Sequence, residues 1–551
     1  MMREALRITK ELSGKDHPDY LIRLSNLARL CKATGRYGEA EKLFLAAIAS
    51  DKEKSGTNGP QYGLKLTNLA ELYQLMGRDL EAEALVKEAL ESYIHFFNRN
   101  CGYLSEKELK QFLETFLGNL DFYQSVLYLE NLKGSDNGGV SMDIELFRKG
   151  LLLRSVLETR KSILESKDTA LINRYNTFIA FRKQASELSL LPRKKQVKDP
   201  DLLIERAGEL EKELTLLSRQ YRKSSEENTI TWEKIQDRLN PGEALVEFTG
   251  FRFYNKKWSD STFYCAILLR KDDKQPKIVY LCEEKQLGRA APSPGSNPSA
   301  LDLAYHGGRG MIIIPDSGIY LGGELYSLVW QPFDTLLKNI HTEYYSPSGL
   351  TSTLSFAAIP SPEGKLLSEK FRLVQVSSAR TLVADHNEMI LTDLALFGGI
   401  NYKMDTTEML AESIQYSKPG NTLLAYQVSR TGNLSGFEHL ENTLVELKEI
   451  KAKMEEKKLV VRTFTGSAAV EESFMNISGK ESPVIIHIAT HGFYYPYRVV
   501  PQQIDKGNFT EIGQERFSSS EDPLLRSGLA FAGANRTWTG KSIRRDWKMA
   551  S

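Results

Sequence analysis

The chain of 551 residues is long enough for three or four domains, and its content of 41% hydrophobic and 26% charged residues is typical of a globular protein. The 72 Lys and Arg residues are balanced by 71 Asp and Glu residues, which argues against a nucleic-acid interface because phosphate contacts need a surplus of cations. No apolar run approaches the ~18 residues of a membrane span, and the N-terminus lacks the apolar core of a signal peptide. Four scattered cysteines suit a reducing compartment, so we expect a cytoplasmic, multi-domain chain without membrane contact.

The first hundred residues contain an internal repeat with a spacing of 42 residues. The pair Leu27-Ala28 recurs as Leu69-Ala70. The other matches are Gly35-Arg36 with Gly77-Arg78, Ala40-Glu41 with Ala82-Glu83, and Ala47 with Ala89. A fixed period of this length predicts a solenoid of helical hairpins, in which small alanines let antiparallel helices approach and the glycines end a helix in a left-handed turn.

These residues, over 1–95, resemble tetratricopeptide repeats of the 42-residue kind found in kinesin light chains. Two full hairpins and one half are present, so we expect the solenoid to stack on the segment that follows or to continue before Met1. The resemblance implies a concave face that binds a protein or peptide partner. The alternative is that the repeats serve only as a helical scaffold.

Residues 96–229 keep a helical pattern and are predicted to form a linker region. The clearest break is the sequence GSDNGG at 134–139. Two further helices are expected at 143–190 and 200–226, forming a long antiparallel hairpin. The basic stretch at 192–195 between them is interpreted as a solvated loop rather than a nucleic-acid patch.

After residue 228 the pattern changes to strands that alternate with helices, which predicts a mostly parallel sheet covered on both faces. An irregular loop is expected at 288–310, and helices at 321–339, 443–457 and 468–476. Strands are expected at 244–248, 263–269, 277–281, 342–346, 371–377, 394–398, 459–465 and 484–490, the second and third as an antiparallel pair.

The sharpest motif is VIIHIATHG at 484–492, an apolar strand that ends in a threonine, a histidine and a glycine. The carboxyl end of a strand is where an open α/β sheet holds its ligand or its catalytic groups. With the order of elements before it, this motif resembles the CHAT domain, a caspase-like peptidase domain often fused to tetratricopeptide repeats. Supporting segments lie at 245–248, 348–360, 440–450 and 522–529. The resemblance covers 230–551 and implies an α-solenoid with a long helical linker, followed by a caspase-like α/β sheet domain.

The resemblance implies a cysteine peptidase with a His/Cys dyad. His491 would be the catalytic histidine, which activates the thiol and returns a proton to the leaving amine. The backbone N–H of Gly492 would stabilise the oxyanion. His487, on the same strand, is interpreted as a hydrogen-bonded histidine within the sheet. No metal or cofactor is expected, because residues four apart on a strand lie ~13 Å from each other and cannot share one ion.

The nucleophile itself is missing, because no cysteine follows Cys282. Cys265 and Cys282 precede the histidine strand and are interpreted as packing residues. Ser527 and the serines at 518–520 do not follow a strand, and a hydroxyl without a strong base is a poor nucleophile. We therefore expect a CHAT domain that is truncated before its catalytic cysteine, with the histidine strand left without one parallel neighbour.

The predicted function is that of a CHAT-family cysteine endopeptidase regulated through protein binding by the repeats, and inactive in this chain because the cysteine is absent. The resemblance also implies a bacterial protein, with activation by a partner and a role in prokaryotic defence or programmed death. A polypeptide would be the substrate if the chain were active. The alternative is a non-catalytic interaction scaffold or adaptor. A nucleotide-binding domain is disfavoured because Gly398-Gly399 has no accompanying phosphate loop.

Overall fold

The structure is a computed structural model that describes residues 1–15, 17–57, 59–100, 103–149, 151–189, 198–218, 230–290, 321–383, 390–416, 436–477, 481–494 and 527–535. The chain forms two compact units: residues 1–176 with 208–385, and residues 177–207 with 386–551. Within the described ranges, no helix is both long enough and apolar enough to cross a membrane. The expected order of a helical region followed by an α/β region is confirmed.

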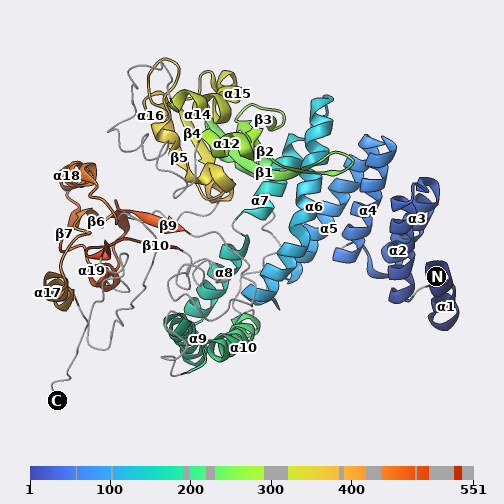
Figure 1. Cartoon of the computed structure of the whole chain (residues 1–551), viewed down its shortest axis with the longest axis horizontal. Coiled ribbons are helices and arrows are strands. Elements are labelled where there is room, and N and C mark those ends of the chain that lie inside the picture. The colour runs from blue at the N-terminus through green and yellow to red at the C-terminus, as the bar shows by residue number, and fades with distance from the viewer. Residues whose placement is uncertain are drawn as a thin grey trace, which may run out of the picture. The chain divides into compact units, whose positions relative to one another are not determined.

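The repeats of the first unit form antiparallel helices that stack side by side (Figure 1). The helices are α1 (Met2–Ser13), α2 (Pro18–Ala33), α3 (Tyr37–Ser55), α4 (Pro60–Met76) and α5 (Asp79–Asn100). The matched alanines at Ala28, Ala40, Ala47, Ala70, Ala82 and Ala89 are all fully buried. A larger side chain at any of these positions would push neighbouring helices apart, which explains why the repeat keeps alanine there.

The matched glycines end the first helix of each hairpin. Gly35 and Gly77 both have φ of 74°, in the left-handed region that costs glycine little. Each turn is closed by the same backbone bond, from Arg36 N–H to the Cys31 carbonyl and from Arg78 N–H to the Tyr73 carbonyl. The 42-residue period therefore encodes the turn as well as the packing.

The linker region continues as α6 (Glu106–Leu132), α7 (Gly138–Arg148), α8 (Leu151–Glu165), α9 (Thr169–Ser189) and α10 (Pro200–Ser218). The predicted break at 134–139 is confirmed. The single helix predicted at 143–190 was wrong, because three helices cover that range. Lys149 has extended backbone angles, and α9 begins anew where Asp168 accepts hydrogen bonds from the N–H groups of Ala170 and Leu171. The basic stretch at 192–195 and the end of the predicted helix at 219–226 lie outside the described residues.

The first unit also contains a five-stranded sheet with the order β3-β2-β1-β4-β5. Its strands are β1 (Glu243–Tyr254), β2 (Trp258–Arg270), β3 (Lys277–Glu283), β4 (Thr342–Ser346) and β5 (Arg372–Gln375). The predicted antiparallel pair is confirmed as β2 and β3, whereas β1, β4 and β5 are parallel. The strands thus form a mixed sheet in place of the mostly parallel one that the pattern predicted.

Short helices surround this sheet: α11 (Trp232–Arg238), α12 (Glu284–Ala290), α14 (Leu321–Val329), α15 (Gln331–Asp334), α16 (Leu367–Lys370) and the 3-10 turns η5 (Thr335–Leu337), η6 (Gly349–Thr353), η7 (Phe356–Ala358) and η8 (Ala379–Leu382). The loop predicted at 288–310 is wrong for its first residues, because α12 continues to Ala290, and the rest of that range lies outside the described residues. The helix predicted at 321–339 is interrupted after Val329, because Pro332 has no N–H to continue it and instead occupies the first turn of α15.

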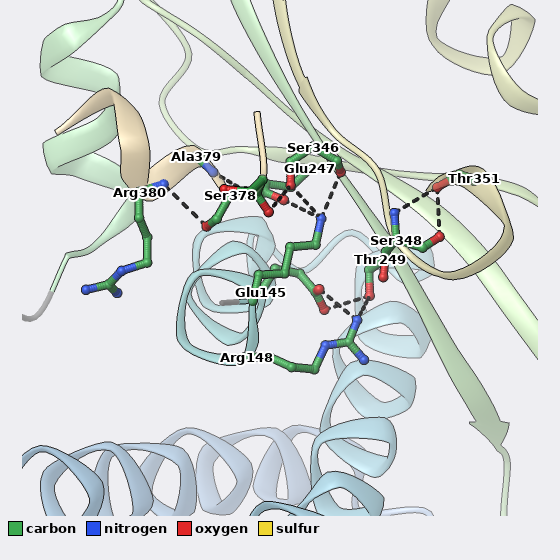
Figure 2. Close-up of polar contacts among 12 residues, drawn as sticks. Glu145, Arg148, Glu247, Thr249, Ser346, Ser348, Thr351, Ser378, Ala379 and Arg380 are labelled. Atoms are coloured by element: carbon green, nitrogen blue, oxygen red, sulfur yellow. Dashed lines mark hydrogen bonds and ion pairs between the residues drawn. The ribbon is translucent and has the colours of Figure 1, made fainter. Parts of the chain in front are cut away.

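A buried polar network joins α7 to the sheet (Figure 2). Lys149, only 9% exposed, donates to Glu247 Oε2 on β1 at 2.6 Å and to the carbonyl and hydroxyl oxygens of Ser346 at the end of β4, at 2.8 and 2.9 Å. Glu247 is fully buried, and its Oε1 accepts from the Ala379 N–H of η8 at 2.7 Å. The ammonium and the carboxylate are therefore both neutralised and hydrogen-bonded, the condition under which buried charges are tolerated.

A second branch of the network lies one turn earlier on α7. Glu145 is fully buried and pairs with Arg148 at 2.8 Å, while its other oxygen accepts from Thr249 of β1 at 2.7 Å and from Gln124 of α6 at 3.0 Å. The helical array and the sheet are consequently joined through charged groups as well as through apolar packing.

One buried acid has no such partner. Glu343 of β4 is fully buried, and neither of its carboxyl oxygens has a hydrogen-bond partner among the described residues. Burial raises the pKa of Glu343 well above its usual value, because desolvation penalises the charged carboxylate. The strand predicted at 342–346 is confirmed, but the sequence of this strand did not indicate that the Glu343 side chain would face the interior.

The second unit is built around a three-stranded parallel sheet with the order β7-β6-β8. Its strands are β6 (Asp393–Ile400), β7 (Val460–Gly466) and β8 (Ile485–Ile488), accompanied by the antiparallel pair β9 (Gly492–Tyr494) and β10 (Ser527–Leu529) and by helices α17 (Thr406–Tyr416), α18 (Glu441–Glu456) and α19 (Glu471–Asn476). Leu394 and Leu396 pack with Leu447 of α18, while Ala395 and Phe397 pack on the other face with α19. Helices therefore cover both faces of this sheet, as predicted.

The strand that precedes His491 lies at an edge of this sheet. Among the described residues β8 pairs only with β6. Ile485 and Ile486, which point to opposite faces, are 41% and 40% exposed. A parallel strand with apolar groups open on both faces is unusual, because parallel strands are normally buried.

We predict that Lys149→Met lowers the free energy of unfolding of the first unit by about 3–5 kcal/mol, because it leaves the Glu247 carboxylate buried without a counter-charge. Adding Glu247→Gln should recover part of this loss. Urea denaturation provides the measurement, and Lys161→Met is the matched control, since its pair with Glu165 is 71% and 62% exposed and is expected to contribute less than about 0.5 kcal/mol. Equal losses for the two lysine variants would contradict the role of the network.

Candidate active site

The candidate site lies at the carboxyl edge of the parallel sheet in the second unit. The chain leaves β6 at Ile400, β7 at Gly466 and β8 at Ile488, all at the same edge because the strands are parallel. This edge is where open α/β sheets place ligands and catalytic groups. The motif at 484–492 places Thr490 and His491 just beyond the end of β8.

A backbone carbonyl fixes the orientation of the His491 ring. Nε2 of His491 lies 2.8 Å from the carbonyl oxygen of Glu438. Because a carbonyl only accepts hydrogen bonds, Nε2 must carry the proton, and in the neutral ring the lone pair is then on Nδ1. The rings of Tyr402 and Phe437 lie against the imidazole, with centroids 5.1 and 5.3 Å away. His491 is thus arranged to take up a proton at Nδ1.

Gly492 begins β9 and faces Leu529 of β10. Ala530 N–H donates to the His491 carbonyl at 2.9 Å, which makes Gly492 and Leu529 a non-hydrogen-bonded pair of the ladder. The N–H of Gly492 therefore points away from β10. A Cβ on Gly492 would meet its nearest neighbours only at 3.8 Å, so the position is open to an approaching group.

Two hydroxyl groups beside His491 are engaged with each other. Thr490 Oγ1 donates to the Ala530 carbonyl at 2.5 Å, so the Tyr402 hydroxyl, 2.8 Å away, must donate to Thr490. Burial raises the pKa of Tyr402. Both protons are committed, and this pair fastens the end of β8 to the segment after β6 and to the residue after β10.

The other residues singled out in the sequence lie elsewhere. His487 Nε2 is 3.3 Å from Glu446 Oε1 of α18, a contact between the sheet and a helix that covers it, and this nitrogen has no hydrogen-bond partner among the described residues, so the expected hydrogen-bonded histidine within the sheet is not found. Cys265 on β2 and Cys282 on β3 are buried in the first unit, and burial raises the pKa of Cys265 above its usual range and that of Cys282 to about 11. Both thiols are therefore poor sources of thiolate. Ser527 starts β10, and the serines at 518–520 lie outside the described residues.

Sequence reasoning missed the groups that support His491. The Glu438 carbonyl belongs to the backbone and has no residue signature. Tyr402 follows β6 at the carboxyl edge, which is the one signal that could have drawn attention to it. Thr490 stood within the motif but received no role.

We predict that Thr490→Val lowers the free energy of unfolding of the second unit by about 1–3 kcal/mol, because it leaves both the Tyr402 hydroxyl and the Ala530 carbonyl without their partner. Tyr402→Phe should cost less, about 0.5–1.5 kcal/mol, because Thr490 keeps its bond to Ala530. Thermal or urea unfolding of the two variants gives the comparison, and a larger loss for Tyr402→Phe would contradict the assigned direction of these bonds.

Comparison with known families places two known modules on the chain. A family model of the tetratricopeptide repeat matches residues 1–53 and 33–95. A family model of the CHAT domain matches residues 320–549, a range that contains His491, Gly492 and the strands of the second unit. A search of curated proteins gave no match. The chain therefore carries tetratricopeptide repeats within residues 1–95 and a CHAT domain at 320–549.

Proposed function

We propose that the chain is a CHAT-family protein that descends from His/Cys peptidases, that His491 is the dyad histidine, and that this 551-residue polypeptide does not by itself hydrolyse peptide bonds. The observation that carries the proposal is the His491 ring, held through Nε2 with a basic Nδ1, in a chain that has no cysteine after Cys282. Gly492, an open position whose N–H points away from β10, supports the same assignment.

With a thiol beside Nδ1, the chemistry would follow from the groups present. His491 would take the thiol proton, and the thiolate would attack the peptide carbonyl carbon. The Gly492 N–H would donate to the oxyanion, and the imidazolium would return its proton to the leaving amine. Without the thiol the first step has no nucleophile, because Thr490 and Tyr402 have already committed their hydroxyl protons.

The repeats supply a binding surface. Residues of α1, α2 and α4 line a groove of about 620 Å³. Leu30 and Leu64 expose 40% and 41% of their surface there, beside the exposed Arg29 and the side-chain amides of Asn26 and Asn68. Exposed leucines next to Arg29, for which no ion pair is found among the described residues, suit a peptide that carries both an apolar and an acidic side chain. We propose that this groove binds a segment of a partner protein.

A second candidate function is a non-catalytic adaptor, in which the CHAT domain contributes only a platform. The exposed Ile485 and Ile486 on β8 favour it, because they offer an additional contact surface. The two functions make the same prediction for the repeats and for a bound polypeptide, which stays intact in both, and they differ in whether His491 is the histidine of a dyad.

We predict that the full chain retains a subset of peptides from a proteome-derived library and leaves them intact. Leu64→Arg should reduce retention at least tenfold, because it replaces an apolar contact of the groove by a bulky charged side chain. Leu45→Arg is the matched control, since Leu45 on α3 is 46% exposed and does not line the groove. Mass spectrometry of the retained peptides and of new termini measures both effects.

Cleavage that disappears in His491→Ala would contradict the absence of hydrolysis and identify an active peptidase. Equal retention by the Leu64→Arg and Leu45→Arg variants would contradict the proposed groove. Retention without cleavage, unchanged by His491→Ala, is the expected outcome and agrees with both candidate functions.

A further inference from the structure

The Glu438 carbonyl that orients His491 lies in a segment without regular structure. Residues 436–440 precede α18 and belong to no strand or helix. A carbonyl in such a segment holds a fixed position only if other contacts fix its neighbours. The question is which side chain supplies them.

Asn535 makes the required contacts. Its side-chain Oδ1 accepts from the Phe437 N–H at 2.5 Å, and its Nδ2 donates to the Phe437 carbonyl at 2.8 Å. The amide thus satisfies both backbone polar groups of the residue directly before Glu438. Because one partner is a donor and the other an acceptor, only one orientation of the amide fits.

Asn535 is itself held firmly. Its backbone N–H donates to the Tyr402 carbonyl at 3.1 Å, and the Gly533 N–H donates to the Asn401 carbonyl at 3.0 Å, which ties this end of the chain to the residues after β6. The residue is only 8% exposed. The amide is therefore anchored to the carboxyl edge of the sheet, where His491 lies.

The Asn535 amide is also packed closely against Gly436. A Cβ added to Gly436 would lie 2.5 Å from Asn535 Oδ1 and 2.7 Å from Cγ, distances that would force the amide to move. Glycine at 436 is thus a condition for the close approach of the two segments. This contact offers a second and independent way to disturb the amide.

Other contacts of the segment act further along it. His439 Nδ1 lies 3.4 Å from the Ile400 carbonyl, a long hydrogen bond, and the Leu440 carbonyl accepts from Thr443 at 2.7 Å. Both contacts follow Glu438 in the chain. On the side before Glu438, the amide bonds both backbone polar groups of Phe437, whose ring also packs against Tyr402 and His491.

We propose that Asn535 is a positioning residue for His491: by clamping Phe437 it places the Glu438 carbonyl against Nε2, which keeps the proton on Nε2 and the lone pair on Nδ1. The catalytic meaning of this arrangement rests on the proposed function, whereas the placement of the ring does not. Proton uptake in a dyad requires the basic nitrogen to face the thiol, and a ring that is free to turn would present it only part of the time.

The test uses the full chain labelled with ¹⁵N-histidine, with the His491 signals assigned by their disappearance in His491→Gln. A hydrogen-bonded Nε2–H exchanges slowly with water and gives a visible ¹H–¹⁵N signal. We expect this signal in the parent chain and its loss in Asn535→Asp, a variant of the same size that can still accept from Phe437 N–H but, when ionised, cannot donate to the Phe437 carbonyl.

Gly436→Ala is the second variant and should also lose the Nε2–H signal. This variant tests the role of Asn535 if Asn535→Asp does not fold. Tyr402→Phe is the control, because it weakens the same edge of the sheet but leaves the Phe437 clamp in place, and it should keep the signal. A general loss of stability would instead remove the signal from the control too.

Persistence of the Nε2–H signal in either folded variant would overturn the proposal, and so would its absence from the parent chain. The readout reports ring placement without any peptide cleavage. A failure here is therefore distinguishable from a failure of the proposed function, which is measured by intact or cleaved peptides.

Discussion

The ion pair between Lys149 and Glu247 is the constraint on which the first unit depends. It lies where α7 ends and bonds simultaneously to β1, to the end of β4 and to η8, so that three strands or turns from distant parts of the chain meet at one ammonium and one carboxylate. Neither charge is solvated, and each relies on the other for compensation. Because α7 also packs with α6, which follows the repeats, the helical array and the five-stranded sheet form a continuous body. A partner bound by the repeats would therefore act on a unit that also holds this sheet.

The second unit shows the same principle with neutral groups. At the carboxyl edge of β6 and β8, the segments are joined by hydrogen bonds between uncharged groups. The Glu438 carbonyl bonds to His491, the Asn535 amide bonds to Phe437, and the Thr490 hydroxyl links Tyr402 to Ala530. Each link joins segments that are far apart in sequence. The result is a histidine whose basic nitrogen is directed by its surroundings in a CHAT domain whose sequence after Cys282 contains no thiol. These links together fix the orientation of the His491 ring at this edge of the sheet.

Much of the fold could be predicted because it is encoded locally. The 42-residue period of buried alanines and left-handed glycines determined the hairpins, and runs of apolar residues marked β6, β7 and β8. The helix at 143–190 was predicted as one element because its periodicity continues through Lys149 and Asp168, whereas the breaks come from a tertiary ion pair and a local cap. The groups that hold His491 escaped prediction for a different reason. Asn535 lies 98 residues from Phe437, and the Glu438 group that matters is a carbonyl that every residue possesses.

The most direct measurement is labelling of the full chain with a peptide electrophile that alkylates activated cysteines, followed by mass spectrometry of all four cysteine-containing peptides. Burial raises the pKa of the Cys31, Cys265 and Cys282 thiols, and no cysteine follows Cys282, so we expect no adduct whose formation depends on His491. An adduct on any cysteine that forms rapidly in the parent chain and disappears in His491→Ala would show that a thiol of this polypeptide pairs with His491, and would contradict the proposal that the chain alone does not hydrolyse peptide bonds.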